Sequence, residues 1–293
     1  MIVPRREHPP LADERGPRWP TAVAIVCVLA LVVGIGVWFA RDRIGLFRSE
    51  ECRATALQQS VNFQPEQMHH ASTIVLIAVK RGMPARAGSI GIATAIQESK
   101  LRNLSYGDRD SVGLFQQRPS QGWGTVEQLQ EPVFATNAFY DALVKVDGWQ
   151  DMVITEIAQE VQRSGYPEAY ADHEQEGRII ASAMSGHSPE GFVCRLDDPT
   201  AAGRPDTFVR ALSEETGQTG TAAGQVITVT ATDDRHAWAI GAWSVAQAKA
   251  RNVLSVQVGA RQWTRGGGDG AMQWTDATTP VPAGQVVVTL HQG

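Results

Sequence analysis

The apolar positions along the chain follow three different patterns. Residues 20–40 are almost all apolar, residues 64–183 repeat apolar positions at helical spacing, and short stretches beyond residue 225 alternate with a period of two. These patterns are typical of a membrane span, of amphipathic helices and of half-buried strands, respectively. We therefore expect one transmembrane helix, then a mainly α-helical domain, then a small α+β domain.

The first pattern predicts a membrane anchor. Residues 21–40 contain no Asp, Glu, Lys or Arg, and about 20 apolar residues span the core of a bilayer. A cleaved signal peptide is the alternative, but its apolar region is usually ~7 to 15 residues long and ends in small residues, whereas this stretch ends in Val37-Trp38-Phe39-Ala40. We expect residues 20–40 to form an uncleaved span that contacts the lipid bilayer through residues 21–40, and residues 1–19 to form a disordered cytoplasmic tail.

The second pattern predicts a mainly α-helical domain over residues 52–196. One helix begins near Pro65 and ends at Gly82 and Pro84. Further helices are expected at residues 85–101, 131–146, 152–162 and 174–183.

The third pattern predicts a small α+β domain over residues 225–293. Residues 213–224 (SEETGQTGTAAG) are rich in Gly, Thr, Ser and Ala, which is typical of a linker. Beyond them, strand-like alternation at 226–230, 254–258 and 286–290 and a helical pattern at 238–250 give a β-α-β-β-like order. Four tryptophans form either a ligand-binding platform or part of the domain's core: Trp238, Trp243, Trp263 and Trp274.

The charge distribution excludes one class of function. The net charge is −5, from 26 Lys and Arg against 31 Asp and Glu, and the basic residues form no stripe. Nucleic-acid binding normally leaves such a stripe, so we exclude nucleic acid as a partner. Arginines flank residues 20–40 on both sides, so the positive-inside rule leaves the orientation of the span open.

Two cysteines bracket the helical domain. Cys52 and Cys194 are the only cysteines besides Cys27 within the span, and an even pair outside the cytoplasm oxidises readily. We predict a Cys52–Cys194 disulfide, and hence a single-pass protein of the cell membrane with residues 41–293 outside the cytoplasm. The alternative is two unrelated buried thiols.

Glu98 is the main candidate for chemistry. It lies at the end of a predicted helix in which Gly91, Thr94 and Ala95 are its neighbours one and two turns back. Small side chains there would leave a hollow beside the carboxyl, and a partly dry carboxyl keeps its proton to higher pH, as a general acid for a glycosidic oxygen must. The alternative is a solvated helix-end carboxylate or an ion pair with Arg102.

The sequence Gly113-Leu114-Phe115-Gln116 begins 15 positions after Glu98 (113 − 98). A glycine permits a substrate to approach the backbone closely, and a glutamine offers both a donor and an acceptor, which suits the amide of a sugar. The polar loop that follows contains Trp123, which either stacks on a sugar face or packs as an ordinary loop residue.

This combination resembles the lytic transglycosylases and goose-type lysozymes, in which a helix-terminal Glu-Ser is followed at about this distance by Gly-Leu-Met-Gln. The resemblance covers residues 64–194 and is concentrated in residues 93–116. It implies a lysozyme-like fold of the α+β class, with Glu98 as the proton donor and Ser99 as its support. It also implies a saccharide cleft lined by Gly113, Leu114 and Gln116.

Two further positions depend on the same resemblance. The Ala-Tyr-Asn-Ala-Gly motif of the transglycosylases has its nearest counterpart in residues 161–165 (VQRSG), so Tyr170 becomes the candidate for the hydroxyl that faces the acid. Asp108 lies in a Gly-Asp-Arg similar to that of goose-type lysozymes and is a candidate second carboxylate, with ordinary turn chemistry as the alternative. A later acidic position of that family falls at Arg118.

The resemblance thus implies cleavage of the β-1,4 bond between N-acetylmuramic acid and N-acetylglucosamine in peptidoglycan glycan strands. The alternatives are a hydrolytic muramidase that uses Asp108 and an inactive protein that binds or scaffolds the cell wall. No organic cofactor is implied, and the spacing of His, Asp and Glu predicts no metal site. The sequence identifies no protein partner.

Overall fold

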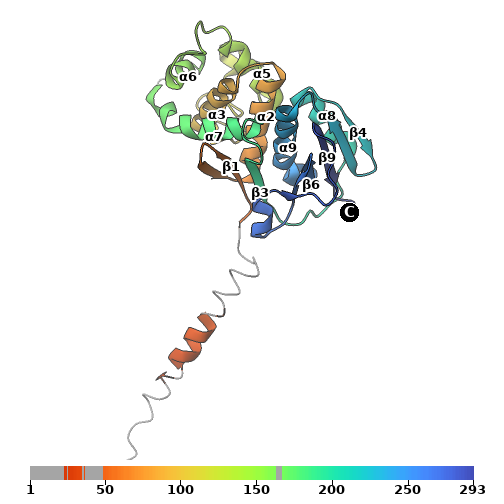
Figure 1. The fold of residues 1–293 in the computed structure, drawn as a ribbon. Helices are drawn as coiled ribbons and strands as arrows, with labels where there is room; N and C mark the ends of the chain where they lie inside the picture. The colour runs from red at the N-terminus through yellow and green to blue at the C-terminus, as the bar shows by residue number, and fades with distance from the viewer. Residues whose placement is uncertain (1–22, 25, 35, 37–48, 163–166) are drawn as a thin grey trace, which may run out of the picture. The chain divides into compact units, whose positions relative to one another are not determined.

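The computed structural model describes residues 23–24, 26–34, 36, 49–162 and 167–293 (Figure 1). The chain divides into two compact units, Met1–Arg48 and Ser49–Gly293. The second unit is mixed α and β, with helices and two antiparallel sheets, as the α+β fold class requires.

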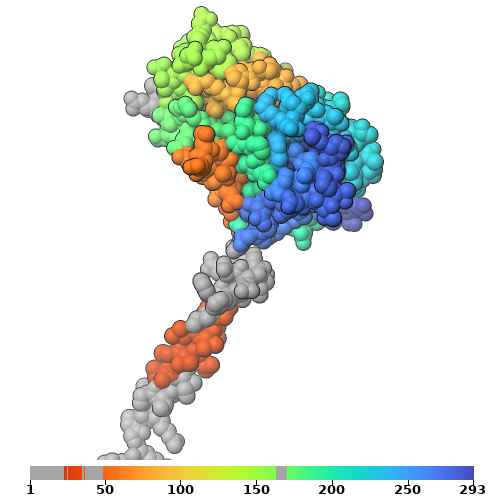
Figure 2. Space-filling view, in the orientation of Figure 1, coloured from red at the N-terminus to blue at the C-terminus, as the bar shows by residue number. Residues whose placement is uncertain are grey.

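In the first unit, the described residues between positions 23 and 36 are helical, and their apolar side chains are exposed (Figure 2). Val26, for example, is 64% exposed. Much of the predicted span at 20–40, and the whole of the predicted tail at 1–19, lie outside the described residues. Among the residues that are described, no helix is both long enough and apolar enough to cross a membrane.

The predicted helices of the second unit are confirmed. Their observed bounds are α2 Pro65–Lys80, α3 Ala85–Ser99, α5 Pro132–Leu143, α6 Ile154–Gln162 and α7 Glu174–Met184. Helix α2 begins as expected because Pro65 occupies its first turn and Gln64 and Gln67 form a capping box. The shorter elements between α3 and α7 are α4 Val126–Leu129 and the 3-10 turns η1 Pro119–Gln121 and η2 Pro167–His173.

A three-stranded sheet, which the sequence did not predict, joins the start of this unit to the strand after α7. Its strands β1 (Glu51–Ala56), β2 (Gln59–Phe63) and β3 (Phe192–Arg195) pair in the order β2-β1-β3. Leu57 and Gln58 both have positive φ, 53° and 61°, which matches the tight two-residue turn of a hairpin. The buried positions of β1 are Cys52, Ala54 and Ala56, whose small side chains give a weak hydrophobic pattern.

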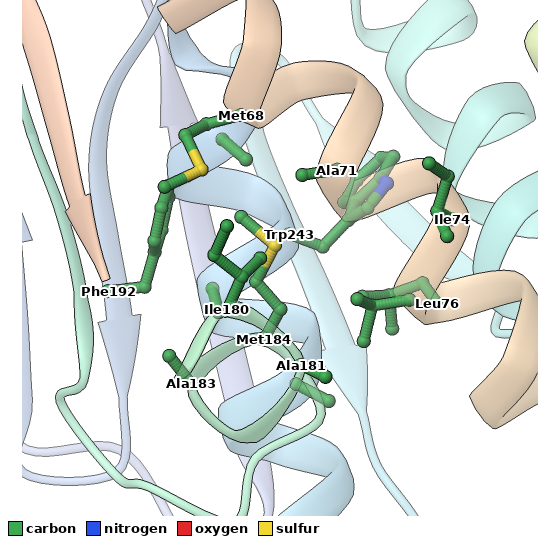
Figure 3. Close-up of a cluster of buried hydrophobic side chains, with 14 of the residues drawn as sticks. Met68, Ala71, Ile74, Leu76, Ile180, Ala181, Ala183, Met184, Phe192 and Trp243 are labelled. Carbon is green, nitrogen blue, oxygen red and sulfur yellow. The ribbon is translucent and has the colours of Figure 1, made fainter. Parts of the chain in front are cut away.

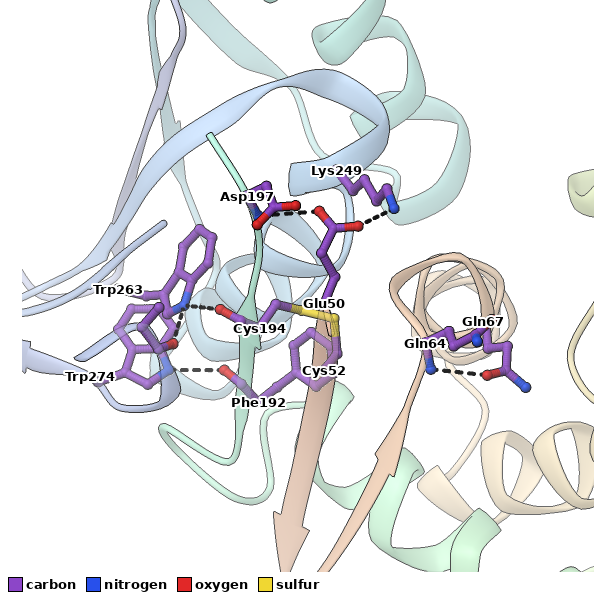
Figure 4. Close-up of a disulfide and its surroundings, with 11 residues drawn as sticks. Glu50, Cys52, Gln64, Gln67, Phe192, Cys194, Asp197, Lys249, Trp263 and Trp274 are labelled. Carbon is purple, nitrogen blue, oxygen red and sulfur yellow. Dashed lines mark hydrogen bonds and ion pairs between the residues drawn. A yellow bond between two sulfur atoms is a disulfide. The ribbon is translucent and has the colours of Figure 1, made fainter. Parts of the chain in front are cut away.

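The predicted disulfide is confirmed. Cys52 lies opposite Cys194 in the register of β1 with β3, and the two sulfurs are bonded. The bond therefore joins the first strand of this unit to the strand that follows the helical segment (Figure 4).

The C-terminal half forms a six-stranded antiparallel sheet. The predicted strands and helix are β5 (Val226–Thr230), α9 (Asp234–Ala246) with α10 (Ala248–Arg251), β6 (Val253–Val258) and β9 (Gln285–Leu290). The additional elements are β4 (Gly220–Ala223), β7 (Arg261–Thr264), β8 (Thr275–Asp276) and the turn η3 (Asp269–Met272). The strand order is β4-β5-β9-β6-β7-β8.

The prediction of a linker at residues 213–224 is wrong. Helix α8 (Pro205–Thr216) continues to Thr216, and β4 follows at once and pairs with β5. Within this segment, Gly220 serves close packing, because a Cβ on it would lie 2.8 Å from Cγ2 of Ile227. A composition typical of a linker here belongs to an edge strand.

Two parts of the second unit, residues 52–196 and residues 225–293, share one hydrophobic core. Figure 3 shows side chains of α2, α7, β3 and α9 in contact, among them Met68, Ile180, Phe192 and Trp243. Trp243 also donates a 2.9 Å hydrogen bond from Nε1 to Glu215 of α8, which accepts a second one from Thr73 of α2. Residues 52–196 and 225–293 are therefore packed together without a separating boundary.

The tryptophans of the C-terminal half are mostly core residues, and the platform alternative is wrong for three of them. Trp243, Trp263 and Trp274 are at most 5% exposed. The indole of Trp263 donates to the carbonyl of Cys194, and that of Trp274 donates to the carbonyl of Phe192 (Figure 4). These hydrogen bonds attach the C-terminal sheet to the strand that carries the disulfide.

Candidate active site

The end of α3 positions Glu98. The helix closes with a Schellman-type motif, in which the N–H of Leu101 donates to the carbonyl of Ala95 and Lys100 adopts a left-handed conformation with φ 56°. Leu101 also has positive φ, 58°, and its side chain is fully buried. Two successive non-glycine residues in this conformation turn the chain sharply just after Glu98 and Ser99.

The small residues near Glu98 do not leave the hollow that was expected. A Cβ on Gly91 would lie 2.8 Å from Cγ2 of Ile74 and 3.0 Å from the hydroxyl of Tyr140, so this glycine allows α2 and α5 to pack closely on α3. Thr94 and Ala95 of α3 are also fully buried. The surroundings of the Glu98 carboxyl are therefore set by other elements.

Tyr170 and Gln162 hydrogen-bond to the Glu98 carboxyl. The Tyr170 hydroxyl donates to Oε1 of Glu98 at 2.5 Å, and Gln162 at the end of α6 provides a second side-chain hydrogen bond. Burial raises the pKa of Glu98 above its usual value, and the hydrogen bonds from Tyr170 and Gln162 lower it by less. The balance favours a carboxyl that holds its proton to higher pH than an exposed glutamate does.

Close packing of α7 on α3 brings Tyr170 to the acid. A Cβ on Gly177 of α7 would lie 2.5 Å from the carbonyl oxygen of Ser89 on α3, so only glycine allows the two helices to approach this closely. The turn η2 leads directly into α7 and carries Tyr170, which is 1% exposed. The position of the hydroxyl thus depends on a glycine seven positions further along (177 − 170).

Ser99 connects the acid-bearing helix to the Gly113–Gln116 segment. Its hydroxyl lies 2.7 Å from the carbonyl oxygen of Leu114 and 3.0 Å from that of Ala95, and it is 4% exposed. Gly113 has φ +81°, and a Cβ there would lie 2.3 Å from the carbonyl oxygen of Leu129. Ser99 therefore holds this segment against the end of α3, while the glycine at position 113 allows the segment to approach the backbone of α4 closely.

Two predicted cleft residues are engaged inside the protein. The Leu114 side chain is fully buried, so the structure places it in the core and not on a cleft wall. The Gln116 amide donates to the carbonyl oxygens of Gly113 and Tyr106 at 3.1 and 3.3 Å. Of the three predicted cleft residues in this segment, Gly113 and Leu114 are buried and Gln116 is partly exposed.

Asp108 lies in the solvent. Its side chain is 92% exposed, and its ion-pair contact is with the adjacent Arg109 at 3.9 Å. Asp110 instead accepts hydrogen bonds from Arg118 and Ser120, which hold the pKa of its carboxyl far below the usual value. Asp108 is therefore solvated, and Asp110 contributes to the structure of the loop.

Trp123 borders a pocket of about 640 Å³ that the sequence did not predict. The pocket lies between the loop after η1, the end of α5 and the end of α6, and Val161 forms part of its lining. Val161 precedes Gln162, which donates a 2.6 Å hydrogen bond to the carbonyl of Phe115 and also contacts Glu98. The last turn of α6 thus lines the pocket through Val161 and contacts Glu98 through Gln162.

The structure brings together Glu98, Ser99, Tyr170 and the Gly113–Gln116 backbone, while Asp108 stays apart. Sequence reasoning missed Gln162, although it lies in the VQRSG segment that was aligned with the Tyr-Asn motif. In the described ranges no group of three or more His, Cys, Asp or Glu could hold a metal ion. The chain matches no protein-family model and no curated protein sequence.

Proposed function

We propose that this protein cleaves the β-1,4 bond between N-acetylmuramic acid and N-acetylglucosamine in peptidoglycan, with Glu98 as the catalytic acid and base. The observation that carries the proposal is the Glu98 carboxyl, whose pKa is raised by burial while the Tyr170 hydroxyl fixes its orientation at 2.5 Å. A carboxyl that keeps its proton to higher pH than an exposed glutamate is suited to protonate a glycosidic oxygen.

In the first step, protonated Glu98 donates its proton to the oxygen between C1 of the muramyl residue and C4 of the next sugar. The C1–O bond breaks, the N-acetylglucosamine side leaves as an alcohol, and positive charge develops at C1. The resulting Glu98 carboxylate is stabilised by the hydrogen bonds of Tyr170 and Gln162. These donors favour the charged form just when it is produced.

In the second step, the 6-hydroxyl of the same muramyl residue attacks C1, and Glu98 takes up its proton. The product is a 1,6-anhydromuramyl end, and Glu98 is again protonated. The nucleophile is already tethered to the substrate, so no second carboxylate is needed to activate water. The solvated position of Asp108, paired with Arg109, favours this route over hydrolysis with Asp108 as base.

The second candidate is a protein that binds or scaffolds the cell wall without turnover. Two observations favour it: the side chains of Leu114 and Gln116 are engaged within the protein, and residues 161–165 lack the Tyr-Asn of the transglycosylases. Such a protein would bind glycan strands but release no product.

We also propose that the chain is anchored in the cell membrane through residues 21–40, with residues 41–293 outside the cytoplasm. The uncharged sequence and the exposed apolar side chains of the described residues from 23 to 36 support the anchor. The Cys52–Cys194 disulfide supports an oxidising compartment for the folded unit.

The deciding experiment is incubation of the full chain in detergent with purified sacculi, followed by mass spectrometry of the soluble fraction. The proposal expects muropeptides that end in the 1,6-anhydro form. Protein that sediments with sacculi but releases nothing would support the scaffold candidate instead.

A further inference from the structure

Helices α8 and α9 cover one face of the six-stranded sheet (Figure 1). A Cβ on Gly220 of β4 would lie 3.2 Å from Cδ2 of Leu212 on α8, and a Cβ on Gly241 of α9 would lie 2.5 Å from Cγ2 of Val258 on β6. Side chains alternate between the two faces of a strand, so the buried positions of β5, β6 and β9 point toward these helices. The positions between them form the opposite face of the sheet, which we call the outer face.

The outer face carries no charged side chain along the strands that the structure describes. One row of it crosses all six strands in register, and its members are Thr221, Thr228, Val287, Gln257, Gln262 and Thr275. The outward positions on either side of this row hold only Thr, Ser, Gln, Val and Ala. The charged residues of these strands, Arg261 and Asp276, form an ion pair with each other, and Arg261 lies in register with Val258 on the helix-covered face.

This absence of charge distinguishes the outer face from an ordinary solvated sheet. Exposed strands normally carry Lys, Glu or other charged side chains, which keep copies of a protein apart. The chain holds 26 Lys and Arg and 31 Asp and Glu, so charge is not scarce in it. The outer face is therefore suited to contact with a neutral surface.

The side chains of the outer face argue against three other kinds of partner. Nucleic acid and an anionic membrane surface need Lys or Arg, and insertion into a bilayer needs large apolar side chains, whereas the bulkiest apolar residues here are Val226 and Val287. A sugar would stack on an aromatic ring, but Trp263 of β7 lies on the helix-covered face and is fully buried. A protein surface of matching polarity remains.

The outer face is complementary to itself. Thr, Ser and Gln side chains both donate and accept hydrogen bonds, so two identical faces of this composition can pair across a two-fold axis, where each patch meets its own copy. Two such faces also meet without like-charge repulsion, although the chain as a whole has a net charge of −5. The strand spacing and rise give the face roughly 400 Å² of flat area. Two copies would bury roughly twice that area, close to the ~1,000 Å² of a weak but specific interface.

We infer that the outer face of this sheet binds the same face of a second copy of the chain. The two sheets pack face to face at about 10 Å, with the Thr, Gln and Val side chains of both copies between them. The inference goes beyond the proposed function and stands whether or not Glu98 is catalytic.

The first measurement is sedimentation velocity of the full chain in a density-matched detergent. An interface of this size predicts a dissociation constant of roughly micromolar order. The chain should therefore sediment as a monomer well below that concentration and as a dimer well above it.

Matched lysine variants assign the dimer to the outer face. Val287→Lys and Thr228→Lys, which lie side by side in the central row, should each raise the dissociation constant at least about tenfold, because both copies bring the new charge to the interface. Ser213→Lys is the control, since Ser213 is exposed on α8 and its substitution adds the same charge away from the outer face. Urea unfolding establishes that each variant is folded.

A charge-swapped pair tests self-recognition directly. Thr228→Lys chains and Thr228→Glu chains, carrying different affinity tags, are mixed and one tag is captured. The two variants should pair with each other at close to the wild-type affinity while each pairs poorly with itself, because opposite charges then face each other across the interface.

A full chain that stays monomeric at every concentration would overturn the inference. A dimer that the two lysine variants do not weaken would overturn it as well, since association would then come from another part of the chain, such as residues 21–40. Failure of the Lys and Glu variants to pair, with both shown to be folded, would equally exclude contact between two outer faces.

Discussion

The hydroxyl of Tyr170 donates a hydrogen bond to Oε1 of Glu98, although the two residues are 72 positions apart in the sequence. The contact joins the end of α3 to the turn before α7, so the ionisation of one carboxyl depends on how these two helices pack. Its removal should therefore alter the pH dependence of the proposed reaction.

Tyr170→Phe should move the alkaline limb of the pH profile to higher pH. The tyrosine hydrogen bond lowers the Glu98 pKa and so opposes the upward shift that burial causes. Loss of this hydrogen bond should therefore raise the Glu98 pKa further. A general acid is active while protonated, and activity is lost as pH rises through its pKa. The profile of kcat/KM on glycan strands measures the shift, and Tyr106→Phe, at an exposed tyrosine, is the control. A limb that stays in place would remove Tyr170 from the control of Glu98.

Glu98→Gln should lower the release of muropeptides by about 10² to 10⁴, the usual worth of general acid catalysis. Glutamine keeps the shape of the side chain and can still accept the Tyr170 hydrogen bond, so binding to sacculi should persist. Release is measured by chromatography of soluble products. Glu156→Gln, at an exposed helical position, should retain wild-type activity. Wild-type release by the Glu98→Gln variant would exclude Glu98 as the acid.

Asp108→Asn should retain most of the activity, because the Asp108 side chain is 92% exposed and paired with its neighbour Arg109. The soluble products should end in the 1,6-anhydro form, which mass spectrometry distinguishes from a free reducing end by the loss of one water. Reducing ends in the wild-type products, together with an inactive Asp108→Asn variant, would instead identify a hydrolytic muramidase.

Removal of the disulfide by Cys52→Ala with Cys194→Ala should lower the free energy of unfolding by about 2 to 5 kcal/mol. The bond spans 142 positions, so its loss frees a long segment in the unfolded chain. Urea unfolding of the two proteins measures the difference. Equal midpoints and slopes would mean that the bond contributes nothing to stability.

Glu215→Gln should flatten the dependence of stability on pH. Burial raises the pKa of Glu215 above 4.5, although hydrogen bonds from Trp243 and Thr73 oppose the shift. Between pH 4.5 and the raised folded value, the unfolded state has lost a proton that the folded state still holds, so stability falls as pH rises through this window. Glutamine removes that proton exchange and retains an oxygen that accepts the two hydrogen bonds. Urea unfolding from about pH 4 to about pH 8 should show a shallower fall for the variant than for the wild type.

The sequence predicted the five longer helices of residues 65–184, the helix α9 and the strands β5, β6 and β9 because their periodicity was strong. Pro65 at one end and Gly82 and Pro84 at the other defined α2 within one or two residues. Strand β1 was missed because its inward positions are Cys52, Ala54 and Ala56, and small side chains give little contrast with their polar neighbours. Edge strand β4 was mistaken for a linker for the same reason.

The candidate site was predictable where it depended on local sequence and less so where it depended on packing. Glu98 and Gly113 were found from their position and spacing, and Ser99 and Tyr170 from the resemblance. Gln162 could not be found, since an amide at a helix end has no signature until α6 is placed against Phe115. The small residues on α3 predicted a hollow, whereas Gly91 serves the approach of neighbouring helices.

The indoles of Trp263 and Trp274 bind the carbonyls of the strand that holds Cys194, and Trp243 packs against α2. A chain that contained only residues 49–196 would expose to water the apolar face of α2 that packs on Trp243, and the loss of that burial would destabilise the fold. The C-terminal sheet and the segment that carries Glu98 thus form one folding unit, and a chain cut between them should lose stability in both parts.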